Sequence, residues 1–206
     1  MPARLRPTAP IAADAILVGD PGRALMLAQE LLQQPKMSNH ARGLWGYTGL
    51  THEEHELTVQ STGMGGPSAT VVLHDLAELG VRQAVRVGTC TVLKDFQLGQ
   101  LVVVGEANGA RPDGELTAAL EERLGGPAAA VVSLDTLHRH APAGEISGDL
   151  ADMQTAALLT TASQVAVAAG ALLIVSETRA GESIGDEDLE AAAKRAGGAA
   201  AAILSA

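Results

Sequence analysis

Aromatic residues and positive charges are scarce in this chain. Trp45, Tyr47 and Phe96 are the only aromatics among 206 residues, and 14 Lys and Arg stand against 24 Asp and Glu, for a formal net charge of −10. Proteins that bind nucleic acid strands use aromatic side chains for stacking and many basic residues for the phosphates. Both shortages argue against nucleic acid as a partner, so any anion site must be local and built from a few arginines.

Cysteines and long apolar runs are also scarce. Cys90 is the single cysteine, which excludes a disulfide within the chain and a cysteine-rich metal site. No apolar run approaches the ~18 residues of a membrane span, and the first 20 residues lack the continuous apolar segment of a secretory signal. We therefore expect a protein of the reducing cytoplasm without a membrane partner.

Apolar residues make up 47% of the chain and are mainly Ala, Val and Leu, enough for one sizeable domain. The pattern predicts strands at 15–18, 43–48, 56–62, 83–88, 100–105, 129–133 and 171–176, with a loop at 141–149. It predicts helices at 23–34, 67–79, 115–124, 151–168 and 186–204. Alternating strands and helices indicate a single α/β domain over residues 1–206, with a mixed, mostly parallel central sheet flanked by helices on both faces.

Ligands of such sheets bind at the carboxyl ends of the strands. We therefore expect the site among Gly19–Arg23, Gly63–Ser68, Arg86–Thr91, Ser133–Thr136, Asp152–Gln154 and Ser176–Glu177.

The first of these segments is "GDPGR", residues 19–23. Glycine lets a ligand approach the backbone and proline fixes the turn. Arg23 at a helix start opposes the helix dipole unless an anion is bound there. A plain turn with a surface arginine explains the same residues.

Two further segments suit an anion. "STGMGGPSA", residues 61–69, places a glycine-rich loop before a helix, although it lacks the Gly-Lys-Ser/Thr of a nucleotide-binding loop. Arg86 lies within the apolar strand of "VRVGTC", and a buried arginine needs an anionic partner. That partner is either a protein carboxylate or a phosphate, and Thr89 could add a hydroxyl. "HEEH" at 52–55 is better read as an exposed turn than as a metal site.

Five motifs in this order carry a resemblance: GDPGR, RGLWGYTG (42–49), STGMGGPSA, LAELGVRQAVRVGTC (76–90) and DMQTAALLTTA (152–162). The set resembles the nucleoside phosphorylase family, which includes uridine phosphorylase and the hexameric purine nucleoside phosphorylases. The likeness is close over about 15–105 and weaker over 130–180, in a chain that looks shorter than is usual for the family. It implies the family's fold and phosphorolysis of a nucleoside, with inorganic phosphate as co-substrate and no metal or other cofactor.

The resemblance also implies roles for individual residues. Those matching the family's phosphate site are Gly19, Arg23, Arg86 and Thr89, together with Arg42, which family members contribute to the neighbouring subunit. Those near the ribose and base are Met64, Cys90, Thr91, Leu137, Asp152, Met153 and Gln154. Arg23, Arg86 and Glu177 would be catalytic, with Glu177 as the acid that protonates a purine leaving group. The assembly would be a homodimer, or a hexamer of three dimers.

Several residues depart from the family pattern. Gln154 replaces a carboxylate that holds the ribose hydroxyls, Thr91 replaces a glycine, and Leu137 replaces an aromatic residue. Glu177 resembles the purine branch, whereas STGMGGPSA resembles the uridine branch. His138 or His140 could contribute to base recognition, although a loop histidine is more often solvated.

Three interpretations stay open. The chain is a nucleoside phosphorylase of altered specificity, a phosphate- or sugar-phosphate-binding relative with little or no activity, or a nucleosidase that uses water.

Overall fold

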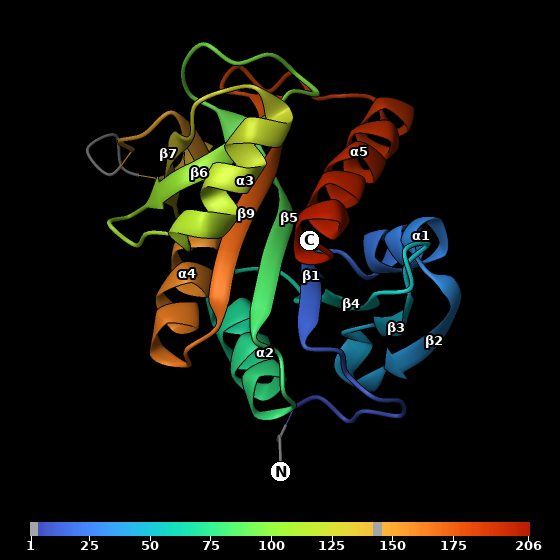
Figure 1. Cartoon of the computed structure of the whole chain (residues 1–206). Helices are drawn as coiled ribbons and strands as arrows, with labels where there is room; N and C mark the ends of the chain where they lie inside the picture. The colour runs from blue at the N-terminus through green and yellow to red at the C-terminus, as the bar shows by residue number, and fades with distance from the viewer. Residues whose placement is uncertain (1–3, 142–145) are drawn as a thin grey trace.

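A nine-stranded mixed sheet forms the centre of the molecule in the computed structural model, which describes residues 4–141 and 146–206 (Figure 1). The strands are β1 Asp14–Val18, β2 Gln33–Asn39, β3 Gly46–Leu50, β4 Glu56–Ser61, β5 Gln83–Val92, β6 Leu101–Ala107, β7 Ala129–Ser133, β8 Leu150–Asp152 and β9 Ala168–Thr178. The helices are α1 Pro21–Leu31, α2 Gly66–Glu78, α3 Gly114–Leu124, α4 Thr155–Gln164 and α5 Asp186–Leu204, with 3₁₀ turns η1 Ala41–Gly43 and η2 His138–His140.

The strand order is β2-β3-β4-β1-β5-β8-β7-β6-β9, and β5 also pairs with β9. Pairings of β1 with β4 and β5, of β5 with β9, and of β7 with β6 and β8 are parallel. The remaining pairings, β2–β3, β3–β4, β5–β8 and β6–β9, are antiparallel. Because β5 contacts both β8 and β9, the strands β5, β8, β7, β6 and β9 close into a ring. The predicted α/β class with a mixed central sheet is confirmed, and the closure is an addition to it.

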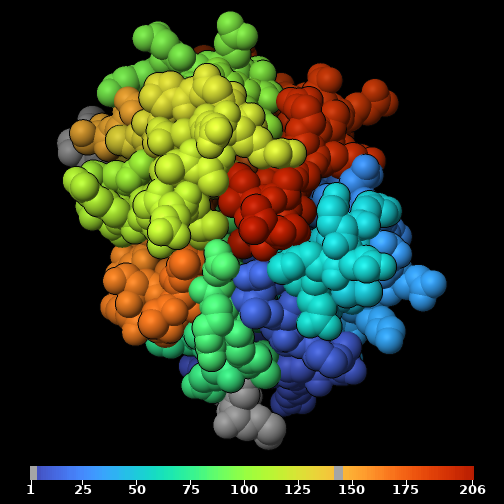
Figure 2. All heavy atoms as spheres, viewed as in Figure 1, coloured from blue at the N-terminus to red at the C-terminus, as the bar shows by residue number. Residues whose placement is uncertain are grey.

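Helices cover the sheet from two sides. One apolar cluster joins the sheet to α2 and α4, and the other joins it to α1, α3 and α5. The space-filling view shows the red atoms of α5 between the yellow-green atoms of α3 and the blue and cyan atoms of the N-terminal part (Figure 2). Small residues allow this packing, since a Cβ on Gly197 of α5 would lie 2.6 Å from Leu27 Cδ2 of α1.

The predicted helix at 23–34 was wrong at its end. The helix stops at Leu31, and Gln33–Asn39 forms β2, an edge strand that pairs with β3. Its sequence, QQPKMSN, is polar and mostly exposed, so it lacks the apolar alternation that indicates a strand. The predicted hairpin has its two strands at Gly46–Leu50 and Glu56–Ser61, a few residues from the expected bounds.

The predicted helix at 151–168 was wrong at both ends. Residues 150–152 form β8, and α4 covers only Thr155–Gln164. Ala166 adopts a left-handed φ of 55°, which ends the helical path before β9 begins at Ala168. The apolar run at 165–175 shows neither helical nor strand periodicity, so the sequence pattern alone does not reveal where the helix ends and the strand begins.

Two further expectations concern the loop at 141–149 and membrane-spanning segments. Of the loop expected at 141–149, residues 142–145 lie outside the described part. Within the described helices, none has both the length and the apolar character needed to cross a membrane.

Candidate active site

A cavity of about 250 Å³ opens at the carboxyl ends of the strands, where the sequence places the site. It is lined by segments that follow β1, β4 and β7 and by the ends of β5, β8 and β9. The lining residues are Gly19, Gly63, Met64, Gly65, Arg86, Thr89, Cys90, Thr91, Thr136, Leu137, His138, Ala151, Asp152, Met153, Gln154, Ser176 and Glu177. The structure therefore brings eleven of the thirteen predicted site residues to one cavity, Arg23 and Arg42 being the other two.

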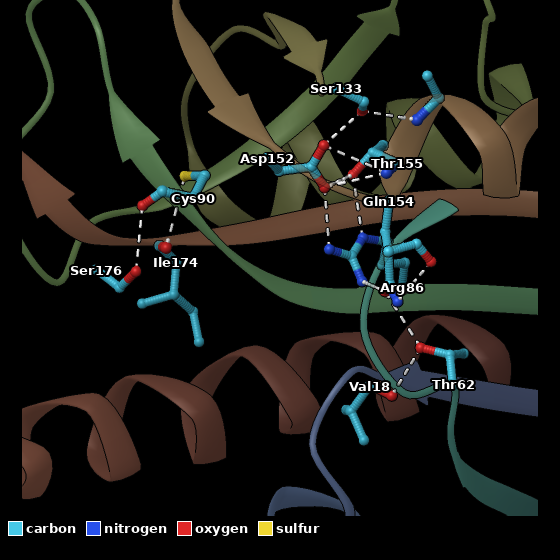
Figure 3. Close-up of polar contacts among 12 residues, drawn as sticks. Val18, Thr62, Arg86, Cys90, Ser133, Asp152, Gln154, Thr155, Ile174 and Ser176 are labelled. Atoms are coloured by element: carbon cyan, nitrogen blue, oxygen red, sulfur yellow. Dashed lines mark hydrogen bonds and ion pairs between the residues drawn. The ribbon is translucent and has the colours of Figure 1, made fainter. Parts of the chain in front are cut away.

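Arg86 lies at the floor of this cavity and is only 4% exposed. Its guanidinium donates through Nη2 to Asp152 Oδ2 at 3.0 Å, through Nη1 to Gln154 Oε1 at 2.7 Å and through Nε to Thr155 Oγ1 at 3.0 Å (Figure 3). From the sequence, the anionic partner of Arg86 was either a protein carboxylate or a phosphate. The structure provides a carboxylate, that of Asp152. A guanidinium has five N–H donors, so three bonds leave it capacity for a ligand.

Asp152 is the centre of the polar network around Arg86. Besides Arg86 it accepts hydrogen bonds from Ser133 Oγ, from Thr155 N at 3.0 Å and from Thr155 Oγ1 at 2.5 Å. Ser133 Oγ also accepts from the amide of Ala156 at the start of α4. These bonds fix both the carboxylate and the first turn of α4. The sequence analysis named Asp152 and placed Ser133 in one of the expected site segments, but it missed Thr155, because an isolated hydroxyl residue carries no distinctive pattern.

Gln154 is 3% exposed and hydrogen-bonded on both sides of its amide. Oε1 accepts from Arg86 Nη1, while Nε2 donates to Gly63 O at 2.5 Å and Gly65 O at 3.2 Å. Thr62 Oγ1 lies 3.2 Å from Oε1, but its one hydrogen is closer to Val18 O at 3.0 Å. Gln154 ties the glycine loop to Arg86, which leaves neither N–H of its amide free for a sugar hydroxyl in this conformation.

Arg23 is the third residue of α1, and its amide donates to Asp20 Oδ1 at 2.7 Å. Burial lowers the pKa of the Arg23 guanidinium, the Asp20 carboxylate acts in the opposite direction, and the charge of Arg86 lowers the pKa further. The positive charge of Arg86 therefore acts on Arg23, although Arg23 is not among the described residues that line the cavity.

Arg42 lies in η1, is exposed and has a left-handed φ of 60°. Non-glycine residues adopt this conformation rarely, and such outliers cluster at functional positions. Its side chain does not line the cavity of its own chain, as far as the described residues define that cavity.

Thr91, His138 and Glu177 line a different part of the cavity wall from the Arg86 network. Thr91 Oγ1 lies 3.3 Å from His138 Nδ1, and Glu177 Oε1 lies 3.8 Å from Arg139 Nη1. A β-bulge in β9 places them, because Cys90 is opposite Val175 whereas Thr91 is opposite Glu177, leaving Ser176 as the extra residue. Bulges re-aim side chains beside active sites, and sequence periodicity does not reveal this one.

Cys90 contributes an inert thiol to the wall. It is buried and lies 3.5 Å from Ile174 O. Burial raises the pKa of the Cys90 thiol far above its usual range, and the nearby Asp152 carboxylate adds to the effect. A protonated thiol is a poor nucleophile, so Cys90 acts here as an apolar surface. At the rim of the cavity, Met64 is 88% exposed and Leu137 42%.

The family model described as "Phosphorylase superfamily" matches residues 14–133. Among curated relatives, the purine nucleoside phosphorylase DeoD-type of Oceanobacillus iheyensis is 38% identical over 108 residues, which is 52% of this chain and 44% of that protein. The protein of the same description from Clostridium novyi is 39% identical over 95 residues, 45% of this chain and 40% of that one. These matches span less than half the length of the curated relatives.

Solved structures match nearly the whole chain. Purine nucleoside phosphorylase from Toxoplasma gondii, in complex with immucillin-H, has a TM-score of 0.79 at 19% identity over 95% of this chain and 90% of that one. Uridine phosphorylase from Vibrio fischeri has a TM-score of 0.79 at 20% identity over 94% and 92%. At this identity the likeness establishes the fold. The family model matches more than half of the chain. This protein therefore belongs to the phosphorylase superfamily, as a member of the nucleoside phosphorylase family.

Proposed function

We propose that this protein is a nucleoside phosphorylase, a pentosyltransferase that uses inorganic phosphate to cleave the N-glycosidic bond of a purine or uridine-type nucleoside. The products would be the free base and a pentose 1-phosphate. One observation carries the proposal: a single cavity has arginine charge in one part of its wall and the Glu177 carboxyl in another.

The phosphate would bind at the Arg86 end. Arg86 has unused N–H donors, Arg23 adds a second positive charge nearby, and Thr89 lines the wall with its hydroxyl. The 13-residue helix α2 begins at Gly66, directly after the glycine loop 63–65, so its unpaired first amides and dipole favour negative charge at this end. Gly19 also lines the cavity, and because it has no side chain a ligand can approach its backbone there.

The proposed reaction follows from phosphate bound near Arg86 and from the Glu177 carboxyl in the same cavity. A phosphate oxygen attacks the anomeric carbon and forms the new C–O bond as the C–N bond breaks. The electron pair of the C–N bond goes to the base nitrogen, which takes a proton from Glu177 when the base is a purine. The arginines orient the phosphate and stabilise its charge, so catalysis relies on positioning and electrostatics, with phosphate as the only co-substrate proposed.

We also propose a homodimer, or a trimer of such dimers, in which Arg42 completes the phosphate site of the neighbouring subunit. Support comes from the exposed position of Arg42 and from its lying outside the described lining of its own chain's cavity. The proposed compartment is the cytoplasm, where the single free thiol of Cys90 stays reduced.

A second candidate function is phosphate or sugar-phosphate binding without effective phosphorolysis. The observation that favours it is the state of Gln154 and Asp152, whose hydrogen-bonding groups are engaged by protein atoms. A nucleoside would then find few free partners for its sugar, whereas inorganic phosphate would still find the unused N–H donors of Arg86.

One assay separates these candidates. Purified protein is mixed with a panel of purine and pyrimidine nucleosides, and release of free base is followed as inorganic phosphate is titrated. Release that rises with phosphate supports the phosphorylase. No release from any nucleoside, with phosphate still raising the melting temperature, would overturn it in favour of the binding protein, whereas release independent of phosphate indicates a nucleosidase.

Matched threonine variants locate the phosphate. Thr89→Val should weaken the dependence on phosphate, because it removes a hydroxyl from the cavity wall while keeping the volume of the side chain. Thr160→Val alters an exposed threonine of α4 outside the cavity and should leave the phosphate response as in the wild type.

A further inference from the structure

Thr91 and His138 form a buried polar pair in the cavity wall. They are 7% and 8% exposed, and Thr91 Oγ1 lies 3.3 Å from His138 Nδ1. His138 belongs to the 3₁₀ turn η2 and Thr91 to β5, so the pair connects the loop after β7 to the central sheet. The proposed function assigns no role to this contact.

The pair fixes which imidazole nitrogen carries the proton. A neutral imidazole has one N–H and one acceptor nitrogen. Among residues 4–141 and 146–206, His138 Nδ1 is the only hydrogen-bond partner of the Thr91 hydroxyl. If Nδ1 carried the proton, the hydroxyl hydrogen would have no acceptor among the described residues, and only a molecule in the cavity that Thr91 lines could pair it. Donation from the hydroxyl to Nδ1, with the ring proton on Nε2, is the arrangement in which the described residues pair both groups.

His138 thus offers an N–H donor to the cavity that it lines. Within the described residues, Nε2 has no hydrogen-bond partner of its own. Glu177 lines the same cavity and is opposite Thr91 in the pairing of β5 with β9, and its carboxylate lies 3.8 Å from Nη1 of Arg139, the residue after His138. A histidine donor and a carboxyl group therefore line one cavity, where one ligand can contact both.

We infer that the Thr91–His138 pair makes this site selective for oxo bases, which carry a carbonyl oxygen beside a ring nitrogen, over the corresponding amino bases. This inference rests on the proposed function, since it assumes that a nucleobase occupies this part of the cavity. The Nε2–H of His138 donates to the carbonyl oxygen, while Glu177 keeps the role proposed above, as the acid that protonates a purine base. Thr91 acts as a positioning residue, because it sets the tautomer of His138 without contacting the base in this scheme.

An amino base presents the wrong group at the same place. Its exocyclic NH₂ would face the Nε2–H, so two donors would meet and neither would be paired. Leaving buried donors unpaired corresponds to a loss of about tenfold to a hundredfold in affinity. For the imidazole to accept from an amino group, its proton would have to move to Nδ1, which breaks the bond from Thr91.

Direct binding of free bases tests the pair without requiring turnover. Hypoxanthine and adenine share one ring system and differ at the oxo or amino position, as uracil and cytosine do in the smaller ring. Affinities for each pair are measured by titration calorimetry in saturating phosphate. The expected result is that the oxo base of at least one pair binds at least about tenfold more tightly than its amino partner.

Variants test whether the hydroxyl sets this preference. Thr91→Val removes the hydroxyl at nearly constant volume, frees the imidazole to present either nitrogen, and should bring the oxo-to-amino ratio close to one. Thr91→Ser restores a hydroxyl and should restore the ratio. His140→Asn is the matched control, since His140 is exposed in the same turn and lies outside the cavity lining, and it should leave the ratio unchanged.

The outcomes separate this inference from the proposed function. Equal affinities, tighter binding of the amino base, binding of neither base, or an unchanged ratio in Thr91→Val would each overturn the selectivity. Nucleoside cleavage without an oxo preference would refute the pair and leave the phosphorylase standing. An oxo preference lost in Thr91→Val, in a protein that cleaves no nucleoside, would support the pair and refute the phosphorylase.

Discussion

The carboxylate of Asp152 compensates the buried positive charge of Arg86. Arg86 and Asp152 are both nearly inaccessible, with Nη2 and Oδ2 3.0 Å apart. Replacing the carboxylate of a buried pair leaves its partner charged without compensation, which destabilises by about 3 kcal/mol or more. We expect Asp152→Asn to lower the free energy of unfolding by about 3 kcal/mol in urea denaturation, and also to loosen the first turn of α4 that Thr155 and Ser133 anchor.

The matched control is an ion pair at the surface. Lys94 Nζ lies 2.7 Å from Asp149 Oδ1, but the lysine side chain is 63% exposed. Exposed pairs contribute ~1 kcal/mol or less, so Lys94→Ala should change the free energy of unfolding far less than Asp152→Asn. Equal losses in the two variants would mean that the Arg86 charge is stabilised by groups other than Asp152.

Asp149 gives a prediction for pH dependence. The hydrogen bond from Lys94 lowers the pKa of the Asp149 carboxyl, and the amide of Ala130 lowers it further. A folded-state pKa below the unfolded value of about 3.9 means that the contribution is present above that pH and is lost as pH falls through the folded-state value. Asp149→Asn should therefore be less stable than the wild type at neutral pH, and denaturation curves should converge as pH falls below about 4. A gap that stays constant with pH would contradict the assignment.

At the scale of single residues, sequence motifs predict which residues line the site but not which hydrogen bonds those residues form. The glycine loops, Arg86 and Glu177 were located from turn chemistry and from the resemblance, and they line one cavity. The hydrogen bonds of Gln154 and the contact of Thr91 with His138 could not be predicted, since they join segments tens of residues apart whose separation depends on the closed sheet. Whether Arg23 and Arg42 bind phosphate stays a prediction.

Among the helices, α5 depends on two adjacent glycines with different surroundings. A Cβ on Gly197 would lie 2.6 Å from Leu27 Cδ2 and 3.2 Å from Leu27 Cδ1, whereas a Cβ on Gly198 would meet nothing within 4 Å. Alanine is preferred over glycine in a helix by ~1 kcal/mol, but overpacking a core costs ~1–3 kcal/mol. We expect Gly198→Ala to raise the free energy of unfolding by up to about 1 kcal/mol and Gly197→Ala to lower it. Thermal unfolding of both variants checks the contrast, and a stabilised Gly197→Ala would show that α1 and α5 can move apart freely.

The predicted helices match the structure well where the hydrophobic periodicity agrees with the residues that mark the ends of a helix. Pro67 and Gly80 bracket α2, where Gly80 has a φ of 110° just past the last turn, and the acidic first turn of α5 begins at the expected residue 186. The predictions failed for β2 and β8. The first is a polar edge strand, and the second is a three-residue strand defined by its neighbours β5 and β7 rather than by its own residues. Tertiary pairing decides such elements, so local patterns cannot.

At the scale of the whole molecule, one exposed arginine predicted for the phosphate site lies outside the described lining of its own chain's cavity. Arg23 and Arg86 provide positive charge from within the chain, while Arg42 projects from η1 as an exposed residue outside the cavity lining. A dimer in which each chain contributes Arg42 to the other would add a third cation to each phosphate site. In that case, activity is a property of the pair rather than of the chain.

Complementation between two defective chains tests this arrangement. Arg42→Ala keeps its own cavity intact, and Glu177→Gln keeps Arg42 intact, so each homodimer alone should have little activity on a purine nucleoside. Half of the dimers are mixed when the coexpressed chains associate at random, and one of the two sites in each mixed dimer is intact, so about a quarter of all sites should work. Phosphate-dependent base release near a quarter of the wild-type value would support the shared site. If Arg42 acted within its own chain, neither site of a mixed dimer would be complete, and coexpression would restore nothing.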